Sequence, residues 1–301
     1  MITLSQTAST LEFTEEGIYR MMDIKNSPTA VILGGDHRMA HTAKVLEESG
    51  FAVIFRGRES GACPPTNTDR RCASLVVLPI PVTRDGEHLN APLSATPIPL
   101  AEVVLSLRPQ QVVASGTLPP SMADALRAKG CRLYDYQADE SFAQWNALAT
   151  AEGAIAMAIA ETDGLLLGSQ CAVLGFGRIA KQLCRLLSAL GAKVTVLARK
   201  KTDLALAATL GYAGVPLIQG EEALAKATLV FNTVPKKLFD FSAMKLSPDA
   251  TVIDLAPIYD ASDSPKVIRG AALPSKYAPA FAGRLIGDCI LAYLREKEES
   301  V

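Results

Sequence analysis

The sequence predicts an α/β fold in which two domains each carry a parallel β-sheet. Three observations support this. Short apolar segments alternate with helical segments along most of the chain, glycine or proline separates many of them, and 301 residues suit one large or two ordinary domains. Such alternation is typical of parallel sheets covered by helices on both faces. We therefore expect two doubly wound, Rossmann-like domains with parallel sheets and a cleft between them.

Composition and charge narrow the class of protein. Hydrophobic residues make up 49% of the chain and charged residues 20%, which is typical of a globular protein. The formal net charge of −1 gives no indication of nucleic acid or an anionic membrane as the main partner. The most apolar segment, 153–168, contains Glu161 and Asp163 and is too short to cross a bilayer. Residues 1–23 lack the pattern of a signal peptide, and we expect a cytoplasmic protein.

Cysteine and histidine spacing indicates neither a dithiol motif nor a metal site. The six cysteines form no CxxC pair, and buried free thiols are expected in the apolar runs that contain Cys171, Cys184 and Cys289. This usage suits a reducing compartment. His37 and His41 have the spacing of two ligands on one helix face, but the sequence has no HExxH motif and no obvious third ligand. We therefore expect no metal.

The first predicted domain occupies residues 29–146 and follows an N-terminal arm at residues 1–28. Residues 79–99 are rich in proline and contain Asp85-Gly86, which predicts a loop or hairpin. The predicted strands are 30–33, 52–55, 75–78, 111–114 and 132–134, and the predicted helices are 37–48 and 120–129.

The second predicted domain occupies residues 169–276, and a helix at about 147–166, within the segment 147–168, joins it to the first. Its predicted strands are 171–174, 193–197, 229–232 and 251–255, and its predicted helices are 178–190, 203–210 and 221–226. A last helix at about 280–295 lies within the C-terminal segment 277–301. Packing back on the first domain is one arrangement open to it.

The strongest motif is a GxGxxA sequence at Gly175, Gly177 and Ala180, which follows one predicted strand and opens a predicted helix. The first glycine permits the tight turn, the second lets the backbone approach a pyrophosphate, and the alanine lets the helix pack closely on the strand. The N–H groups and positive dipole end of such a helix favour phosphate. The motif predicts an NAD(P)-binding Rossmann domain; the alternative is a Rossmann unit that has lost its ligand.

Basic residues after the next strand favour NADP over NAD. An NAD site usually places Asp or Glu there for the ribose 2′-hydroxyl, whereas this chain has Arg199 and Lys200, and Arg can hold a 2′-phosphate with two hydrogen bonds. The alternative is a solvated basic turn. A further strand ends at Thr233-Val234-Pro235, at the sheet edge where ligands bind. The predicted cofactor-binding residues are Gly175, Phe176, Gly177, Arg178, Ile179, Arg199, Lys200, Thr233, Val234 and Pro235.

Strand ends in the first domain predict the substrate side of the cleft. Gly34-Gly35-Asp36-His37-Arg38 follows the first strand, and Arg38 is a candidate for binding a substrate carboxylate. Ser115-Gly116-Thr117 follows another strand and offers N–H and hydroxyl donors at the same edge. The sequence singles out no catalytic acid or base from the candidates Asp36, His37, His88, Tyr136, Glu152 and Lys276.

Several segments together resemble the dipicolinate synthase A-type family of spore-forming bacteria, over about residues 28–296. The particular segments TRDGEHLNAP and LPSKYAPAFAG carry the resemblance more than the widespread fingerprint does. The chain departs from the family at Pro257–Ser262, where a serine and a glycine pair are expected. The matching segments are VILGGDHR (31–38), LPIPVTRDGEHLNAP (78–92), NALATAEGAI (146–155), VLGFGRIA (173–180), FNTVP (231–235) and LPSKYAPAFAG (273–283).

The resemblance implies that a dihydrodipicolinate-type dicarboxylate ring loses a hydride to NADP⁺ and becomes dipicolinate. It also implies that the partner is a flavoprotein-like B subunit, and that the location is the mother-cell cytoplasm of a sporulating bacterium. Because two carboxylates need at least two anion-binding features, one is expected from each domain. The predicted substrate-binding residues are Gly35, Asp36, Arg38, Ser115, Gly116, Thr117 and Lys276, and the favoured catalytic candidates are Lys276, His37 and Glu152.

Two other functions remain open. One is another NAD(P)-dependent dehydrogenase, acting on a hydroxy or amino acid; the other is a non-enzymatic, NADP-binding redox sensor that signals by domain closure. Turnover of dihydrodipicolinate would distinguish the favoured function from that of another dehydrogenase. Any hydride transfer would exclude the redox sensor. The sequence does not determine the oligomeric state, and a homo-oligomer is compatible with it.

Overall fold

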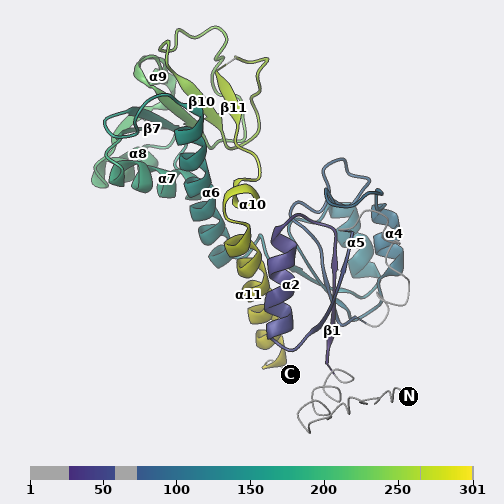
Figure 1. Ribbon diagram of the computed structural model, residues 1–301. Coiled ribbons are helices and arrows are strands. Elements are labelled where there is room, and N and C mark those ends of the chain that lie inside the picture. Colours follow the sequence, from purple (N-terminus) through teal and green to yellow (C-terminus); the bar gives the residue numbers. More distant parts are fainter. Residues whose placement is uncertain (1–26, 58–72, 265, 300–301) are drawn as a thin grey trace, which may run out of the picture.

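Two α/β domains joined by a long helix make up the computed structural model of the chain (Figure 1). The structure describes residues 27–57, 73–264 and 266–299. Nearly all of the predicted N-terminal arm, together with Cys63 and Cys72, lies outside these residues.

The first domain is built on a five-stranded parallel sheet with the strand order β2-β1-β3-β4-β5. Helix α4 has no counterpart in the sequence prediction, because a helix of seven residues is too short to show a clear period. The strands are β1 (Thr29–Leu33), β2 (Ala52–Arg56), β3 (Leu75–Val77), β4 (Val112–Ser115) and β5 (Arg132–Asp135). The connecting helices are α2 (Arg38–Glu48), α4 (Leu100–Ser106) and α5 (Pro120–Ala128).

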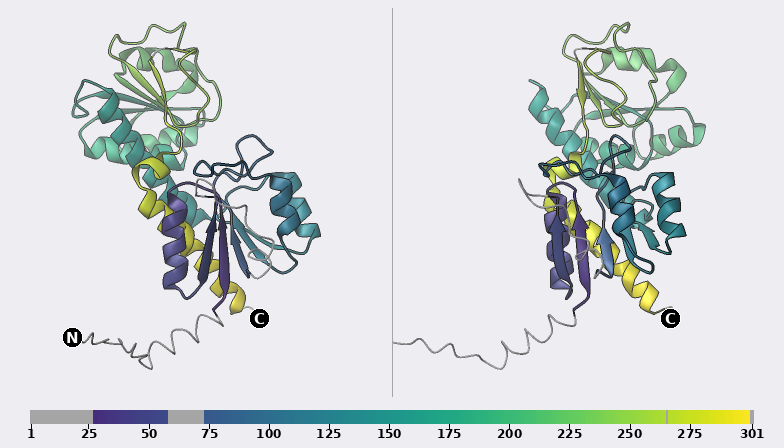
Figure 2. Two further views of the ribbon diagram at one scale, coloured as in Figure 1. Left: turned by 45° about the vertical axis from the view of Figure 1, so that its right-hand side comes forward. Right: turned by 90° about the vertical axis from the view of Figure 1, so that its right-hand side faces the viewer.

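Helices cover both faces of this sheet, as its apolar strands require. On one face, Val103 of α4 and Leu126 of α5 pack with Val31 in one buried cluster. On the other face, α2 is joined by the C-terminal helix α11 (Pro279–Glu298), whose Ile286 and Ile290 belong to the same buried cluster as residues of β1 and α2. The end of the chain therefore completes the core of the first domain (Figure 2).

Helix α6 (Glu140–Glu161) links the two domains and starts earlier than the sequence predicts. The Asp139 carboxylate caps it by accepting hydrogen bonds from the backbone N–H groups of Ser141 and Phe142, at 2.8 and 3.1 Å. The chain leaves the helix at Thr162. The cap and this break place the linking helix on the N-terminal side of the predicted 147–166.

The second domain has a six-stranded parallel sheet with the order β11-β10-β9-β6-β7-β8. The order reverses between β6 and β9, and dinucleotides bind at such a switch point. Its strands are β6 (Gln170–Leu174), β7 (Lys193–Ala198), β8 (Ala213–Pro216), β9 (Leu229–Asn232), β10 (Thr251–Asp254) and β11 (Val267–Arg269). Its helices are α7 (Arg178–Ala189), α8 (Lys201–Thr209) and α9 (Gly220–Lys226), with a 3-10 turn η1 (Leu217–Gln219) before α9. Two parallel, Rossmann-like sheets are therefore confirmed; the edge strands β8 and β11 were not predicted.

Glycines let the connecting helices approach one another closely. A Cβ on Gly283 of α11 would lie 2.1 Å from the backbone oxygen of Arg38 in α2, and the Thr42 hydroxyl donates to the backbone oxygen of Gly283 at 2.8 Å. A Cβ on Gly153 of α6 would lie 2.8 Å from Leu273 Cβ in α10 (Leu273–Tyr277). These close contacts hold α11 against α2 and α10 against α6.

The cysteines of the described residues are free and buried, which confirms the thiols predicted at Cys171, Cys184 and Cys289. Burial raises the pKa of the Cys184 thiol to about 12 and that of Cys289 to about 11, so both stay protonated at neutral pH. In the same part of the chain, no helix has the length and apolar character needed to cross a membrane. Nor do three or more His, Cys, Asp or Glu side chains gather there in a way that could hold a metal ion.

Candidate functional site

The GxGxxA turn has the geometry of a phosphate-binding turn. Gly175 has φ of +90°, and a Cβ there would lie 2.7 Å from Val234 Cγ2 and 2.9 Å from Thr233 Oγ1. Gly177 is extended, and a Cβ on it would meet no heavy atom within 4 Å. Packing within the protein therefore requires only the first glycine, whereas the second borders the open space that a pyrophosphate needs.

Helix α7 presents its N-terminus to that space. It begins at Arg178 with no side-chain cap and no acidic residue in its first turn. Its first N–H groups and the positive end of its dipole therefore suit a bound anion. Ala180 is fully buried, which keeps the helix close to the sheet. These residues fit the pyrophosphate of a dinucleotide.

Two exposed cations follow β7, the strand after which Rossmann domains usually hold the ribose of their cofactor. The backbone oxygen of Leu197 accepts a hydrogen bond from Gly175 N at 2.8 Å, so the end of β7 lies beside the fingerprint turn. Arg199 and Lys200 follow this strand end and are both exposed. A 2′-phosphate placed there would meet positive charge on flexible side chains.

A buried amide–carboxylate pair fixes the loop that follows β9. Asn232 Nδ2 donates to Asp254 Oδ1 at 2.8 Å, and Asn232 Oδ1 accepts from Val234 N at 3.1 Å. The Thr233 hydroxyl donates to the backbone oxygen of Leu174 at 2.7 Å. The predicted cofactor residues Thr233–Pro235 are thus held beside the fingerprint turn. The sequence predicts Thr233–Pro235 as cofactor-binding residues, but nothing in it indicates the Asn232–Asp254 pair.

Arg38, which the sequence predicts to bind a substrate carboxylate, is buried and already paired within the protein. Its side chain donates to the Asp36 carboxylate at 2.9 and 2.8 Å and to the backbone oxygen of Ile80 at 2.8 Å, and only 6% of the residue is exposed. Burial alone would raise the pKa of Asp36, but the hydrogen bonds and charge of Arg38 outweigh it and hold that pKa below its ordinary value. Binding of a substrate carboxylate by Arg38 stays a prediction, and it requires exchange of Asp36 for substrate.

The Ser115–Thr117 turn lies at the carboxyl edge of the same sheet. Ser115 Oγ is fully buried and, within the described residues, has no hydrogen-bond partner. The Thr117 hydroxyl donates to Gln137 Oε1 at 2.6 Å. A Cβ on Gly116 would lie 2.6 Å from Ile80 Cβ, so this position has no room for a side chain. The unpaired Ser115 hydroxyl is a potential donor to a molecule bound at this edge.

A pocket of about 290 Å³ lies between the two domains. Gln137, which follows β5, and Asn146 of α6 line one side, and Gly177, Arg178 and Thr233 line the other. The carboxyl edges of both sheets therefore contribute to one cleft, as the fold class predicts. The predicted cofactor residue Ile179 also lines this pocket.

The favoured catalytic candidates do not line this pocket. His37 and Glu152 are exposed at the start of α2 and on α6, and Lys276 is exposed on α10 with its Nζ 5.0 Å from the Tyr277 ring centroid. Tyr136 is fully buried and donates its hydroxyl hydrogen to a backbone oxygen. Burial raises the pKa of Tyr136 far above its ordinary value, so it is not a base at neutral pH.

An ion pair that the sequence did not reveal joins the linking helix to the fingerprint turn. Arg178 Nε donates to Glu140 Oε1 at 3.0 Å and its Nη2 donates to Glu140 Oε2 at 2.5 Å. Hydrogen bonds from Arg178, and then from Gln144, lower the pKa of Glu140 to about 2, so the carboxylate is charged at neutral pH. Glu140 is therefore paired with the guanidinium of the first residue of α7, the helix whose N-terminus suits a phosphate.

We expect Glu140→Gln to bind NADP more tightly than the parent chain. Removing the competing charge frees Arg178 for the pyrophosphate, and an exposed pair of this kind corresponds to about a two- to fivefold change in Kd. Fluorescence titration with NADPH measures it. Glu222→Gln, which breaks the exposed pair with Lys226 on α9, is the matched control and should leave Kd unchanged. Weaker binding by Glu140→Gln would mean that Glu140 orients Arg178 instead of competing for it.

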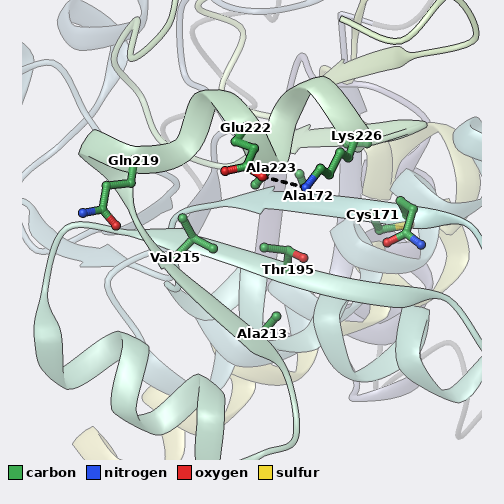
Figure 3. Close-up of a pocket in the computed structure, with 11 residues that line it drawn as sticks. Cys171, Ala172, Thr195, Ala213, Val215, Gln219, Glu222, Ala223 and Lys226 are labelled. Atoms are coloured by element: carbon green, nitrogen blue, oxygen red, sulfur yellow. Dashed lines mark hydrogen bonds and ion pairs between the residues drawn. The ribbon is translucent and has the colours of Figure 1, made fainter.

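Another pocket, of about 400 Å³, lies on a different part of the second domain (Figure 3). The start of β6, at Cys171 and Ala172, lines it together with Glu222 and Lys226 of α9, which pair at 2.6 Å. The fingerprint turn follows the opposite end of β6. This pocket is therefore separate from the dinucleotide site.

Comparison with known proteins agrees with this geometry. The first domain matches the family model for the N-terminal domain of the dipicolinate synthase A-type protein over residues 29–137. The A-type protein of dipicolinate synthase from Bacillus subtilis (strain 168) is 25% identical over 282 residues, covering 88% of this chain and 95% of that protein. The chain resembles the dipicolinate synthase A-type family, as its sequence segments predict.

Solved structures extend the likeness to the whole fold. The crystal structure of the dipicolinate synthase A-type protein from Bacillus halodurans has a TM-score of 0.78 and 26% identity, covering 89% of this chain and 97% of that one. The corresponding crystal structure from Bacillus subtilis has a TM-score of 0.77 and 23% identity, covering 91% and 98%. Residues 170–257 match the model described as NADP oxidoreductase coenzyme F420-dependent. The chain is thus a dehydrogenase-like protein whose second domain is of an oxidoreductase type that takes a nicotinamide cofactor.

Proposed function

We propose that this protein oxidises a dihydrodipicolinate-type dicarboxylate ring to dipicolinate with NADP⁺. The observation that carries the proposal is the likeness to the dipicolinate synthase A-type protein, which covers 95% of that protein from Bacillus subtilis and so includes both sides of the cleft. The fingerprint turn with its open space, the helix N-terminus and the interdomain pocket support it.

Each domain has a distinct task in this reaction. Gly177, the N-terminus of α7 and Arg178 hold the pyrophosphate, and Thr233–Pro235 form a wall beside it. NADP⁺, when bound, supplies a hydride acceptor. The Gly35–Arg38 and Ser115–Thr117 turns of the first domain, with Lys276 of α10, bind the two carboxylates of the ring. We further propose that the partner is a flavoprotein-like B subunit, and that the location is the mother-cell cytoplasm of a sporulating bacterium, since both follow from the resemblance.

The test is turnover. The purified full chain is mixed with NADP⁺ and freshly generated dihydrodipicolinate, with and without a B-type subunit. Formation of NADPH and dipicolinate is followed by absorbance, and both products in equal amounts are the expected result. Hydride transfer with hydroxy or amino acids but not with this ring would instead support a different dehydrogenase, and NADP binding without any hydride transfer would support a sensor.

We expect Arg199→Asp to lose most of the preference for NADP over NAD. A charged contact to the 2′-phosphate contributes about 1.5–3 kcal/mol, so Kd for NADPH should rise roughly 10- to 100-fold, with little change for NADH. Titration with both cofactors measures this. Lys193→Asp makes the same charge change at the opposite, amino end of β7, where Lys193 is exposed, and should have little effect. Equal affinity of the parent chain for NADPH and NADH would contradict the assignment of Arg199.

A further inference from the structure

The loop after β3 holds a histidine–carboxylate pair that the proposed function has not used. His88 Nδ1 lies 2.8 Å from Asp85 Oδ2, and the two side chains are 39% and 54% exposed. Hydrogen bonds from the backbone N–H groups of His88 and Glu87, and then from the His88 ring, hold the pKa of Asp85 far below its ordinary value. Because an ionised carboxylate only accepts hydrogen bonds, Nδ1 carries the hydrogen in this contact. In the neutral ring, Nε2 is therefore the nitrogen with a free lone pair.

The pair is held in a fixed geometry. Asp85 Oδ1 accepts from the backbone N–H groups of Glu87 and His88, both at 2.8 Å, and from the Thr83 hydroxyl at 3.1 Å, while Oδ2 faces the imidazole. The Thr83 oxygen in turn accepts from Gly86 N at 2.9 Å. Both carboxylate oxygens are thus in use, and the ring is oriented by a carboxylate that is itself anchored to the backbone. This is the arrangement of a general base and its orienting partner.

The same loop stands at the edge of the first sheet that forms the cleft. Gly35 N donates to the backbone oxygen of Asn90 at 2.8 Å, which ties the loop to the turn after β1. That carboxyl edge also carries Gln137, which lines the interdomain pocket opposite Gly177. The loop lies on the side of the first domain that faces the second domain (Figures 1 and 2).

The other two histidines lack these features. His37 is exposed at the start of α2, and His41 packs where α2 crosses Gly283 of α11. In the part of the chain that the structure describes, neither ring makes a hydrogen bond or ion pair that would fix its tautomer. The Asp85–His88 geometry therefore distinguishes His88 as a base.

We propose that His88 is the general base of the ring oxidation and that Asp85 is its positioning residue. This inference rests on the proposed function and deepens it. Conversion of the dihydro ring to the aromatic ring breaks two C–H bonds. One hydrogen leaves with its electron pair, as hydride, to the oxidised nicotinamide. The other leaves as a proton to His88 Nε2, and the electron pair of its C–H bond completes the new π bond. The ring is oxidised, NADP⁺ is reduced, and the proton passes from His88 to solvent.

The test compares His88→Gln, Asp85→Asn and His88→Gly in the full chain, under conditions in which the parent chain turns over. We expect His88→Gln to lower kcat by about 100-fold or more, the usual contribution of a positioned base. Asp85→Asn should lower kcat by roughly tenfold, because it removes only the orientation. Added imidazole should restore part of the activity of His88→Gly, an effect that a purely structural role would not produce. Glu87→Gln, an exposed neighbour in the same loop, is the matched control and should keep the parent kcat.

Binding measurements separate this role from substrate binding. Titrations with NADPH, and with dipicolinate in the NADPH-loaded protein, should give Kd values for His88→Gln within about twofold of the parent chain. If the parent chain turns over and His88→Gln keeps the same kcat, the role of His88 is overturned but the proposed function is not. The same holds if His88→Gln binds dipicolinate so weakly that the loss of binding explains the loss of activity. Failure of imidazole to restore any activity also overturns it. No turnover by the parent chain, with or without a B-type subunit, overturns the proposed function and this inference together.

Discussion

Gly177→Val should abolish dinucleotide binding in a chain that stays folded. A Cβ at this position points into space with no heavy atom within 4 Å, and the backbone there is extended, so valine strains neither the packing nor the turn. The branched side chain would occupy the volume of the pyrophosphate and shield the N–H groups of α7. We expect Kd for NADPH to rise by at least about 100-fold, a loss of about 2.7 kcal/mol. Calorimetric titration measures it.

A second glycine supplies the control for this substitution. A Cβ on Gly164 would also meet no heavy atom within 4 Å, and this residue lies in the connection after α6, away from the fingerprint turn. Gly164→Val should bind NADPH as the parent chain does. Unchanged binding by Gly177→Val would show that the GxGxxA turn is not the cofactor site.

Gly283→Val should destabilise the first domain strongly. The new Cβ would lie 2.1 Å from the backbone oxygen of Arg38, so α11 has to move away from α2 and the hydrogen bond from Thr42 to Gly283 is lost. Overpacking against backbone costs about 1–3 kcal/mol or more, and separation of the helices opens part of the buried cluster of the first domain. We expect a loss of about 3 kcal/mol or more in the free energy of unfolding.

Tryptophan fluorescence reports on the packing of α11, the helix that carries Gly283. The single tryptophan, Trp145 of α6, packs edge-to-face against Phe281 of α11, with a distance of 5.9 Å between the ring centroids. Urea unfolding followed at Trp145 should therefore show a lower midpoint for Gly283→Val. Ala292→Val, an exposed position on the same helix, is the control and should cost only a few tenths of a kcal/mol, roughly the difference in helix propensity. Equal midpoints for the two variants would contradict the close crossing.

The sequence predicted those features whose cause is local. The GxGxxA pattern, the apolar strands and the helical periods each depend on a few neighbouring residues, so the two parallel sheets and the fingerprint turn follow from them. Short elements were not predicted because they contain too few residues to show a hydrophobic period: β8 has the sequence Ala-Gly-Val-Pro and α10 has five residues. The start of α6 was missed because an Asp139 cap, and not the apolar run, determines it.

Contacts between distant segments could not be predicted. The sequence gives Arg38 as a candidate for a substrate carboxylate but does not show that the fold buries it, with the Asp36 carboxylate and the backbone oxygen of Ile80 as hydrogen-bond acceptors. The pairing of Glu140 with Arg178 joins positions 38 residues apart and depends on where α6 meets α7. The predicted roles of Ser115, Thr117 and Lys276 still depend on the position of a substrate, and they stay predictions.

Because the C-terminal helix packs in the core of the first domain, that core can be completed only at the end of synthesis. Helix α11 supplies Ile286 and Ile290 to the core that β1 and α2 begin, so one face of the first domain is made from residues at both extremes of the described chain. On the ribosome, residues 29–137 emerge first, but α2 covers only part of that face until residues 279–298 are translated. The second domain is contiguous from β6 to β11, so all its strands have been synthesised before then. The domain that is translated first is therefore the last to be completed, and without α11 part of its apolar core surface is exposed.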